Sequence, residues 1–116
     1  MRFMSFAETQ IQIRNKTKTV TRRMGWYFLK IGDILLPVNK VMGFKKGEHP
    51  IAIQCPIRII NIRKEPLWWI TPEDCIKEGF PDLSPEAFIK MFCRINAAKK
   101  CTRNSIVHAI EFEYTK

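Results

Sequence analysis

The sequence has no apolar run long enough to cross a membrane and no apolar leader at its start. A membrane-spanning helix needs about 20 consecutive apolar residues, and no stretch of the 116 residues approaches that length. The first ten residues, MRFMSFAETQ, include Glu8 and other polar residues where a signal peptide needs an apolar run. We therefore expect a soluble, cytoplasmic protein that does not contact membranes.

The four cysteines lack the spacing of a metal-binding motif. They stand at positions 55, 75, 93 and 101 without a CxxC pair, which argues against a zinc knuckle or ribbon. Nothing indicates secretion, so we expect four reduced, mostly buried thiols and no cofactor. A metal site formed by Cys93, Cys101 and His108 is the alternative.

Signatures of common enzymes are also missing. The chain contains no GxSxG, P-loop, HExxH or GxGxxG motif. Of its two histidines, His49 lies in a predicted loop and His108 on an apolar strand face. A single histidine on an apolar face is usually a core residue with satisfied hydrogen bonds, so the histidines do not indicate a catalytic site.

Positive charge is abundant. Twenty Lys and Arg residues oppose eleven Asp and Glu residues, which gives a formal net charge of +9. Four of these cations (Lys16, Lys18, Arg22 and Arg23) fall within eight residues, and Lys45-Lys46 and Lys99-Lys100 form two doublets. Such a charge attracts polyanions, so we expect a nucleic acid or nucleotide as ligand. The alternative is a merely solubilising surface.

Local patterns predict one α+β domain over residues 1–116. Ser5 and Glu8 have capping-box spacing, which predicts a helix over 6–15. Thr71 before Pro72 predicts a helix that ends at Gly79, and Ser84 before Pro85 predicts another. The second of these helices has an apolar face of Phe88, Ile89, Phe92 and Ile95.

Strand patterns surround these helices. Strands are predicted over 18–23, over 34–38 after a turn at Gly32-Asp33, over 51–62 with an edge or bulge at Pro56, and over 106–114. Residues 43–50 read as a loop. In the last strand, one face is predicted to carry Ile106, His108, Ile110, Phe112 and Tyr114.

The segment KTVTRR at 18–23 is the strongest candidate site. Its hydroxyl, guanidinium and ammonium groups suit phosphate oxygens or base edges. An extended strand would put Lys18, Val20 and Arg22 on one face and Thr19, Thr21 and Arg23 on the other. The alternative is an edge strand that carries charges to prevent aggregation.

Glu78 is a second candidate, and the three tryptophans are considered beside it. Trp26 follows KTVTRR and offers a stacking face for a base, or else fills the core. Trp68 and Trp69 are adjacent, so on a strand at most one of them is a core residue. Glu78 is the last predicted helical residue before Gly79, where the helix dipole disfavours a carboxylate.

Together these motifs resemble the ASCH family. The resemblance rests on KTVTRR followed by Gly-Trp, on Gly32-Asp-Ile-Leu, on the segment TPEDCIKEGF at 71–80 and on a closing Ile-Glu-Phe strand. Within this family, the chain most resembles the short, single-domain ASCH proteins of phages and prophages. The resemblance implies a PUA-like small mixed β-barrel with short flanking helices, and a cleft that handles RNA. One branch, the bacterial N(4)-acetylcytidine amidohydrolases, uses a Lys, a Thr and a Glu that match Lys18, Thr21 and Glu78.

These observations predict a domain that binds RNA, other single-stranded nucleic acid or a modified nucleoside. The alternatives are a nucleoside amidohydrolase, a ribonuclease, or an adaptor that docks an unknown protein through Trp68 and Trp69. In the amidohydrolase, Lys18 is the base, Thr21 the nucleophile or water anchor, and Glu78 the acid, so Lys18 and Glu78 should be in contact. The predicted nucleic-acid contacts are Lys16, Lys18, Thr19, Thr21, Arg22, Arg23 and Trp26.

Overall fold

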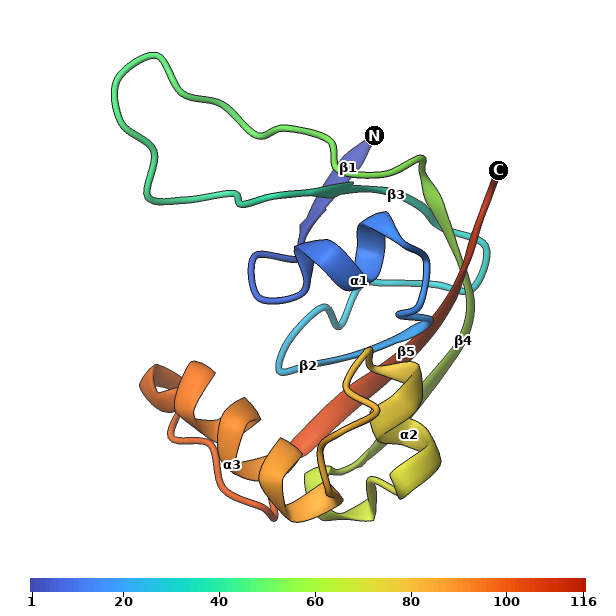
Figure 1. Cartoon of the computed structure of the whole chain (residues 1–116), viewed down its shortest axis with the longest axis vertical. Coiled ribbons are helices and arrows are strands. Elements are labelled where there is room, and N and C mark those ends of the chain that lie inside the picture. The colour runs from blue at the N-terminus through green and yellow to red at the C-terminus, as the bar shows by residue number, and fades with distance from the viewer.

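Five strands form one mixed sheet in the order β1-β3-β4-β5-β2 (Figure 1). The structure, a computed structural model, describes all residues from 1 to 116. The strands are β1 (Arg2–Ser5), β2 (Val20–Arg23), β3 (Ile34–Val38), β4 (Ile57–Pro66) and β5 (Ile106–Tyr114). β1 is parallel to β3, and the other neighbours are antiparallel. None of the helices is long and apolar enough to cross a membrane.

Three short α-helices flank the sheet: α1 (Gln10–Arg14), α2 (Pro72–Lys77) and α3 (Pro85–Ile95). Two 3-10 turns, η1 (Leu67–Trp69) and η2 (Ala97–Lys99), follow β4 and α3. The predicted starts of α2 and α3 are confirmed, because Thr71 and Ser84 accept hydrogen bonds from the backbone N–H groups of Asp74 and Ala87. The expected α+β class is therefore present.

The sheet is open, which corrects the expected barrel. β1 and β2 are its two edges and do not pair with each other. The long strands β4 and β5 bend strongly across the molecule (Figure 1), and their register shifts between Ile59 and Asn61. A bulge of this kind bends a sheet and brings its edges closer without joining them.

Two sequence-based boundaries are wrong near non-local pairings. The predicted helix 6–15 is only α1, because Ser5 ends strand β1 and pairs with Val38. The predicted strand 51–62 reduces to an isolated bridge at Ala52 and the later strand β4. Pro56 has no N–H for a ladder, so the regular strand begins after it.

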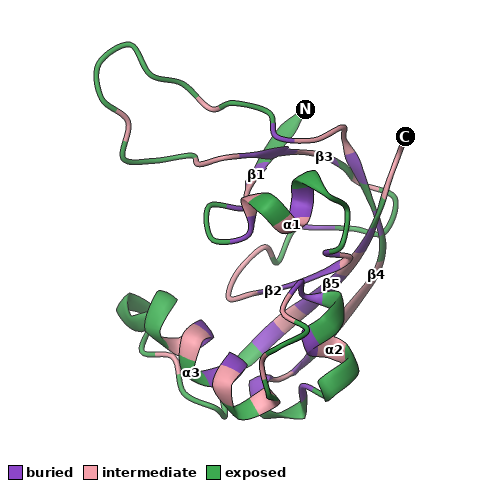
Figure 2. Cartoon of the chain, viewed as in Figure 1, coloured by how far each residue is buried: buried purple, intermediate pink, exposed green.

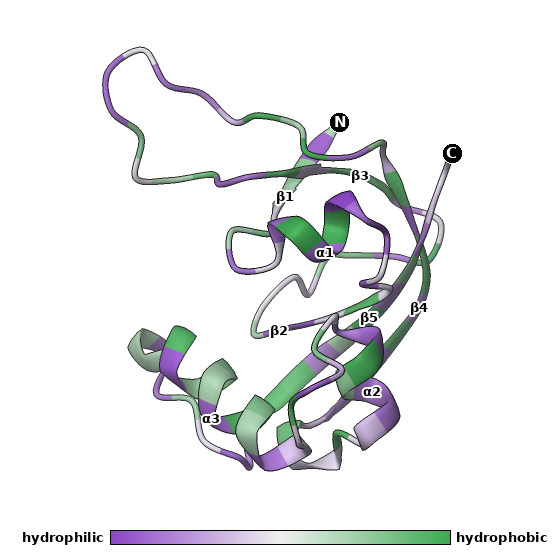
Figure 3. Ribbon diagram, viewed as in Figure 1, coloured by the Kyte–Doolittle hydropathy of each residue, from purple (hydrophilic) through white to green (hydrophobic).

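Two apolar clusters form the core. The first lies under the sheet and includes Met4, Ile13, Leu35, Ile59 and Phe112, and the second joins η1, α2 and α3 through Leu67, Cys75, Phe88, Phe92 and Val107. Figure 2 shows buried residues along the inner side of α3, and Figure 3 shows hydrophobic residues where β4 and β5 run side by side. The loop between β3 and β4 projects away and is mostly exposed (Figure 2).

Strand β5 contributes to both clusters from opposite faces, which differs from the predicted single apolar face. Ile110 and Phe112 belong to the first cluster and Val107 to the second, while Ile106 is exposed. Ile95, predicted on the apolar face of α3, is also exposed. The second face of β5 is covered by η1 and α3, and this explains why β5 buries residues on both of its faces.

Trp68 and Trp69 lie in η1 rather than on a strand, and both are about half exposed, at 49% and 54%. Leu67 provides the buried residue of that turn instead. The two indole rings meet edge to face with centroids 6.2 Å apart. Neither tryptophan is therefore a core residue.

Candidate functional site

Lys18 ends the stretch before β2 and reaches the end of helix α2. Its Nζ donates to the Oε1 of Glu78 at 2.8 Å and to the backbone oxygen of Glu78 at 2.9 Å. Both side chains are at most 4% exposed. The last carbonyls of a helix have no partner within the helix, so Lys18 caps α2 while it neutralises the carboxylate. The contact expected between Lys18 and Glu78 is present.

Gly79 allows helix α2 to end close to helix α1. It follows the C-cap residue Glu78 with a φ of +94°, the left-handed conformation that favours glycine. A Cβ at this position would lie 2.7 Å from the side chain of Gln12 and 3.5 Å from the Cβ of Lys18. The distance to Lys18 is an ordinary contact, whereas the distance to Gln12 is a clash, so glycine is needed for the close approach of α2 to α1.

Arg22 lies behind Glu78 and is surrounded by carboxylates. Its terminal nitrogens reach Glu78 at 3.1 Å, Asp74 at 3.1 Å and Glu65 at 3.4 Å, and its side chain is 0% exposed. Burial alone would raise the pKa of Asp74, but hydrogen bonds from Thr71 and the charge of Arg22 together hold that pKa below its usual value. Arg22 is thus a partner of acidic side chains and has no free guanidinium for phosphate.

Arg23 points to the other side of β2 and bridges the open edges of the sheet. Its Nε donates to Thr21 Oγ1 at 3.0 Å, and its Nη2 donates to the backbone oxygen of Ser5 in β1 at 2.7 Å. The guanidinium also lies over the ring of Phe6, 4.9 Å from its centre. Burial lowers the pKa of Arg23 to about 10, so the group stays charged at neutral pH.

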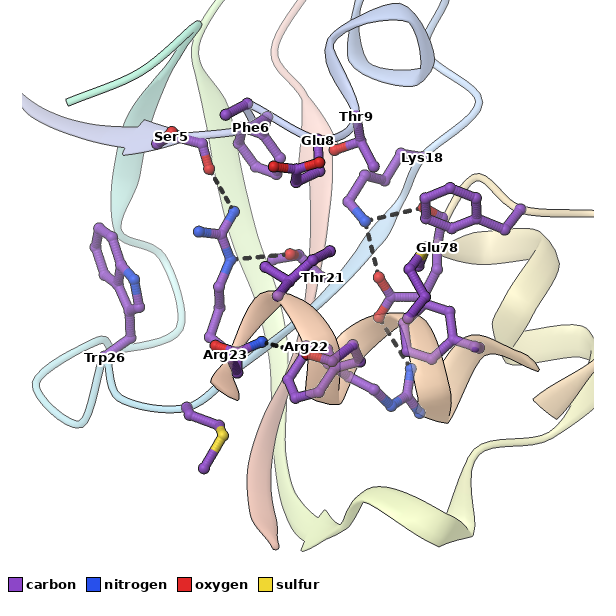
Figure 4. A pocket seen from close by; sticks show the side chains of 18 of the residues that line it. Ser5, Phe6, Glu8, Thr9, Lys18, Thr21, Arg22, Arg23, Trp26 and Glu78 are labelled. Atoms are coloured by element: carbon purple, nitrogen blue, oxygen red, sulfur yellow. Dashed lines mark hydrogen bonds and ion pairs between the residues drawn. The ribbon is translucent and has the colours of Figure 1, made fainter. Parts of the chain in front are cut away.

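These side chains surround a cavity of about 310 Å³ between the two apolar clusters (Figure 4). Lys18, Thr21, Arg23 and Glu78 give it a polar side. The opposite wall is apolar and comes mainly from α3 and the segment before it, with Phe80, Phe88, Met91, Phe92 and Ile95. Five of the six buried polar residues of the chain line this cavity, and the sixth, Glu65, binds Arg22.

Lys18 is the only primary amine among the buried residues of the cavity. Burial lowers its pKa, and the neighbouring carboxylate of Glu78 opposes this effect. Thr21 lines the same cavity, and its oxygen accepts the hydrogen bond from Arg23. The arrangement therefore combines a primary amine, a hydroxyl and a paired carboxylate around one space.

The remaining predicted contacts are distributed differently. Trp26 lines the cavity, packs on Phe28 with ring centres 5.3 Å apart, and has a φ of +61°, which is rare for a bulky residue. Lys16 is exposed and donates to the backbone oxygen of Lys116. Thr19 is half-buried and bonds through its backbone to Lys77 and Phe112. Neither Lys16 nor Thr19 lines the cavity.

Sequence reasoning missed several cavity residues because they come from other segments. Glu8 and Thr9 lie in the turn before α1, and Asn96 and Lys99 lie at the end of α3 and in η2. Lys99 donates to the backbone oxygen of Met24 at 2.6 Å and so links η2 to the loop after β2. The sequence singled out only the Lys99-Lys100 doublet, as a charge cluster, and Glu8, as part of a capping box.

The cysteines and histidines lie outside the cavity. All four thiols are free, and only Cys75 is fully buried, which corrects the expectation of mostly buried thiols. No three His, Cys, Asp or Glu side chains are gathered as metal ligands, so Cys93, Cys101 and His108 do not form the alternative site. The Nδ1 of His108 lies 2.9 Å from the backbone oxygen of Gly25, a satisfied position as predicted.

Comparison with known proteins gives the fold. No protein-family model and no curated protein matches the sequence. Protein EF3133 from Enterococcus faecalis V583, of the family DUF984, superposes with a TM-score of 0.70 at 14% identity, over 99% of this chain and 76% of its own. The hypothetical protein PH0355 superposes with a TM-score of 0.64 at 18% identity, over 97% of this chain and 98% of its own.

The third structure is an ASCH domain from Lactobacillus crispatus JV V101. Its TM-score is 0.63 at 14% identity, over 97% of this chain and 79% of the other. Such identities show a shared fold. The predicted resemblance to ASCH domains is thereby confirmed at the level of the fold, with an open five-stranded sheet in this chain.

Proposed function

We propose that the cavity binds one nucleoside, either free or as an unstacked residue of single-stranded RNA. The observation that carries this proposal is the convergence of nearly all buried polar side chains on one cavity that also has an aromatic wall. Ligand cavities start at about 300 Å³, and the volume of about 310 Å³ suits one nucleoside rather than a helical segment. Apolar walls accommodate the faces of a base, and polar groups its edges.

The proposal assigns different roles to the two arginines. Arg23 keeps one terminal nitrogen, Nη1, without a protein partner on the cavity side, so it is available to a ligand. Both terminal nitrogens of Arg22 are paired with carboxylates, only its buried Nε has no partner, and the side chain positions Glu78. We therefore retain Lys18, Thr21, Arg23 and Trp26 as ligand contacts and assign Arg22 a structural role.

A titration with cytidine, N(4)-acetylcytidine and a short oligoribonucleotide tests this proposal. Tryptophan fluorescence reports occupancy through Trp26, and Trp26→Phe identifies its share of the signal. Thr21→Val keeps the shape but removes the hydroxyl, so affinity should fall roughly three- to tenfold, the effect of one neutral hydrogen bond. Thr102→Val, at an exposed position outside the cavity, should leave affinity unchanged. Absence of saturable binding, or equal effects of the two variants, would contradict the proposal.

A second candidate function is hydrolysis of an N-acyl nucleoside, favoured by the lowered pKa of Lys18, which lines the same cavity as Thr21. Neutral Lys18 would take the proton of Thr21 while Thr21 Oγ1 bonds to the acyl carbon. Cleavage of the C–N bond would follow, with the proton passed to the leaving amine, and water would then hydrolyse the acyl ester.

In this candidate reaction Glu78 holds Lys18 rather than donating the proton. Both of its oxygens already accept hydrogen bonds, one from the amine of Lys18 and one from the guanidinium of Arg22. Lys18 would therefore return the proton itself. Chromatography of the N(4)-acetylcytidine titration samples decides the matter, since release of cytidine and acetate supports hydrolysis and unchanged ligand supports binding alone. No cavity contact favours the ribonuclease or adaptor alternatives.

A further inference from the structure

Glu8 brings a carboxylate to the cavity that no cation of the protein neutralises. The carboxylate of Glu78, in contrast, binds both Lys18 and Arg22. Glu8 lines the same cavity and takes part in none of the ion pairs of the chain. Figure 4 shows its side chain between Phe6 and Thr9, on the wall opposite α3.

The backbone around Glu8 is held at both ends. Phe6 N donates to the backbone oxygen of Val38 at 3.0 Å, and Thr9 N donates to that of Phe6 at 3.0 Å. Phe6 and Thr9 are buried, at 2% and 6% exposure. Glu8 is therefore an exposed residue on a fixed turn that lines the cavity.

The free groups around it are mainly hydrogen-bond donors. Arg23 has an unused terminal nitrogen, and Lys99 lies at the end of the cavity beside Met24. Donors alone would suit phosphate or another anion equally well. A carboxylate accepts hydrogen bonds and repels anions, so Glu8 changes which ligand groups are accepted on its side.

We propose that Glu8 is a specificity-determining residue that accepts a hydrogen bond from an N–H or O–H donor of the bound nucleoside. The donor is the amino group of a base or a ribose hydroxyl, which share this chemistry. The inference rests on the proposed nucleoside binding. It adds that the site selects ligands that carry a hydrogen-bond donor facing Glu8. The anionic or acceptor groups of the ligand then face Arg23.

Three nucleosides and three variants test this selection. Cytidine, uridine and 2′-deoxycytidine are titrated by calorimetry against the wild type, Glu8→Gln and Glu8→Ala. Glu73→Gln is the matched control, because Glu73 is an exposed acid outside the cavity. Thermal unfolding checks that each variant is folded. Hydrogen bonds to charged groups predict a loss of about tenfold or more in affinity for the preferred ligand on Glu8→Ala.

The ratios of the affinities for the three nucleosides separate the outcomes. A contact with the base amino group makes the wild type prefer cytidine over uridine, and both Glu8 variants reduce that preference. A contact with ribose instead reduces the preference for cytidine over 2′-deoxycytidine. Both results support the inference, whereas unchanged ratios with retained binding overturn it and leave nucleoside binding intact. If the wild type binds no nucleoside at all, the proposed function fails and this inference fails with it.

Discussion

The guanidinium of Arg22 is a sensitive point of the molecule, because it is the one cation that pairs with all three acidic side chains around it. Removing one partner of a buried ion pair typically costs about 3–5 kcal/mol, since the other charge stays buried without compensation. Arg22→Met should therefore lower the free energy of unfolding by roughly that amount, as measured by urea denaturation. Arg58→Met is the control, because Arg58 pairs with Glu113 at 2.9 Å with both side chains about half exposed.

Exposed pairs contribute about 0–1 kcal/mol, so the control should change stability little. Equal losses in the two variants would show that the carboxylates around Arg22 find other partners. Lys18, Thr21 and Glu78 were predictable from the resemblance of their motifs. The role of Arg22 was not, because its acidic partners are 43 to 56 residues away in β4 and α2, and only the fold brings them together.

Helix α2 ends where it does because Gly79 allows close contact with α1. Gly79→Ala adds a methyl group that meets Gln12 Cβ at 2.8 Å and also forces an L-residue into a φ of +94°. Gly47→Ala is a matched control, with a φ of +89° and nothing within 4 Å. The conformational cost of about 1–2 kcal/mol applies to both. Overpacking adds about 1–3 kcal/mol at Gly79 alone, which thermal unfolding of both variants measures. Equal destabilisation would mean that α1 yields to the methyl group.

The elements that the sequence predicts well are those with signals inside their own segment. Thr71-Pro72 and Ser84-Pro85 start their helices through side-chain caps, and Gly79 ends α2. The short strand β1 has no such signal, since its pairing with β3 joins residues more than 30 positions apart. The bridge at Ala52 likewise depends on Val38. A prediction from local periodicity runs a strand or a helix past such points, because the local sequence contains no information about which distant segment pairs with it.

At the scale of the whole molecule, the charge excess lies outside the buried network. This network contains three cations and three anions, so its charges cancel. The cations are Lys18, Arg22 and Arg63, and the anions are Glu65, Asp74 and Glu78. The formal net charge of +9 therefore comes entirely from the other residues. Lys99 lines the cavity from η2 and Lys100 follows it in the chain, whereas Lys45 and Lys46 lie in the projecting loop. Phosphates on either side of a bound nucleoside would meet the first pair.

This distribution predicts how salt affects binding. The affinity for a neutral nucleoside should be the same at 50 and 200 mM salt, because no phosphate contact releases counterions. The affinity for a single-stranded oligoribonucleotide should fall, with a log–log slope of about −0.7 per phosphate contact. Replacing Lys99 and Lys100 by Ala should flatten that slope by up to about 1.4 units, twice the single-contact value. Replacing Lys45 and Lys46 should change it less if RNA follows the cavity, and an equal change in the two double variants would show attraction to the general surface charge instead.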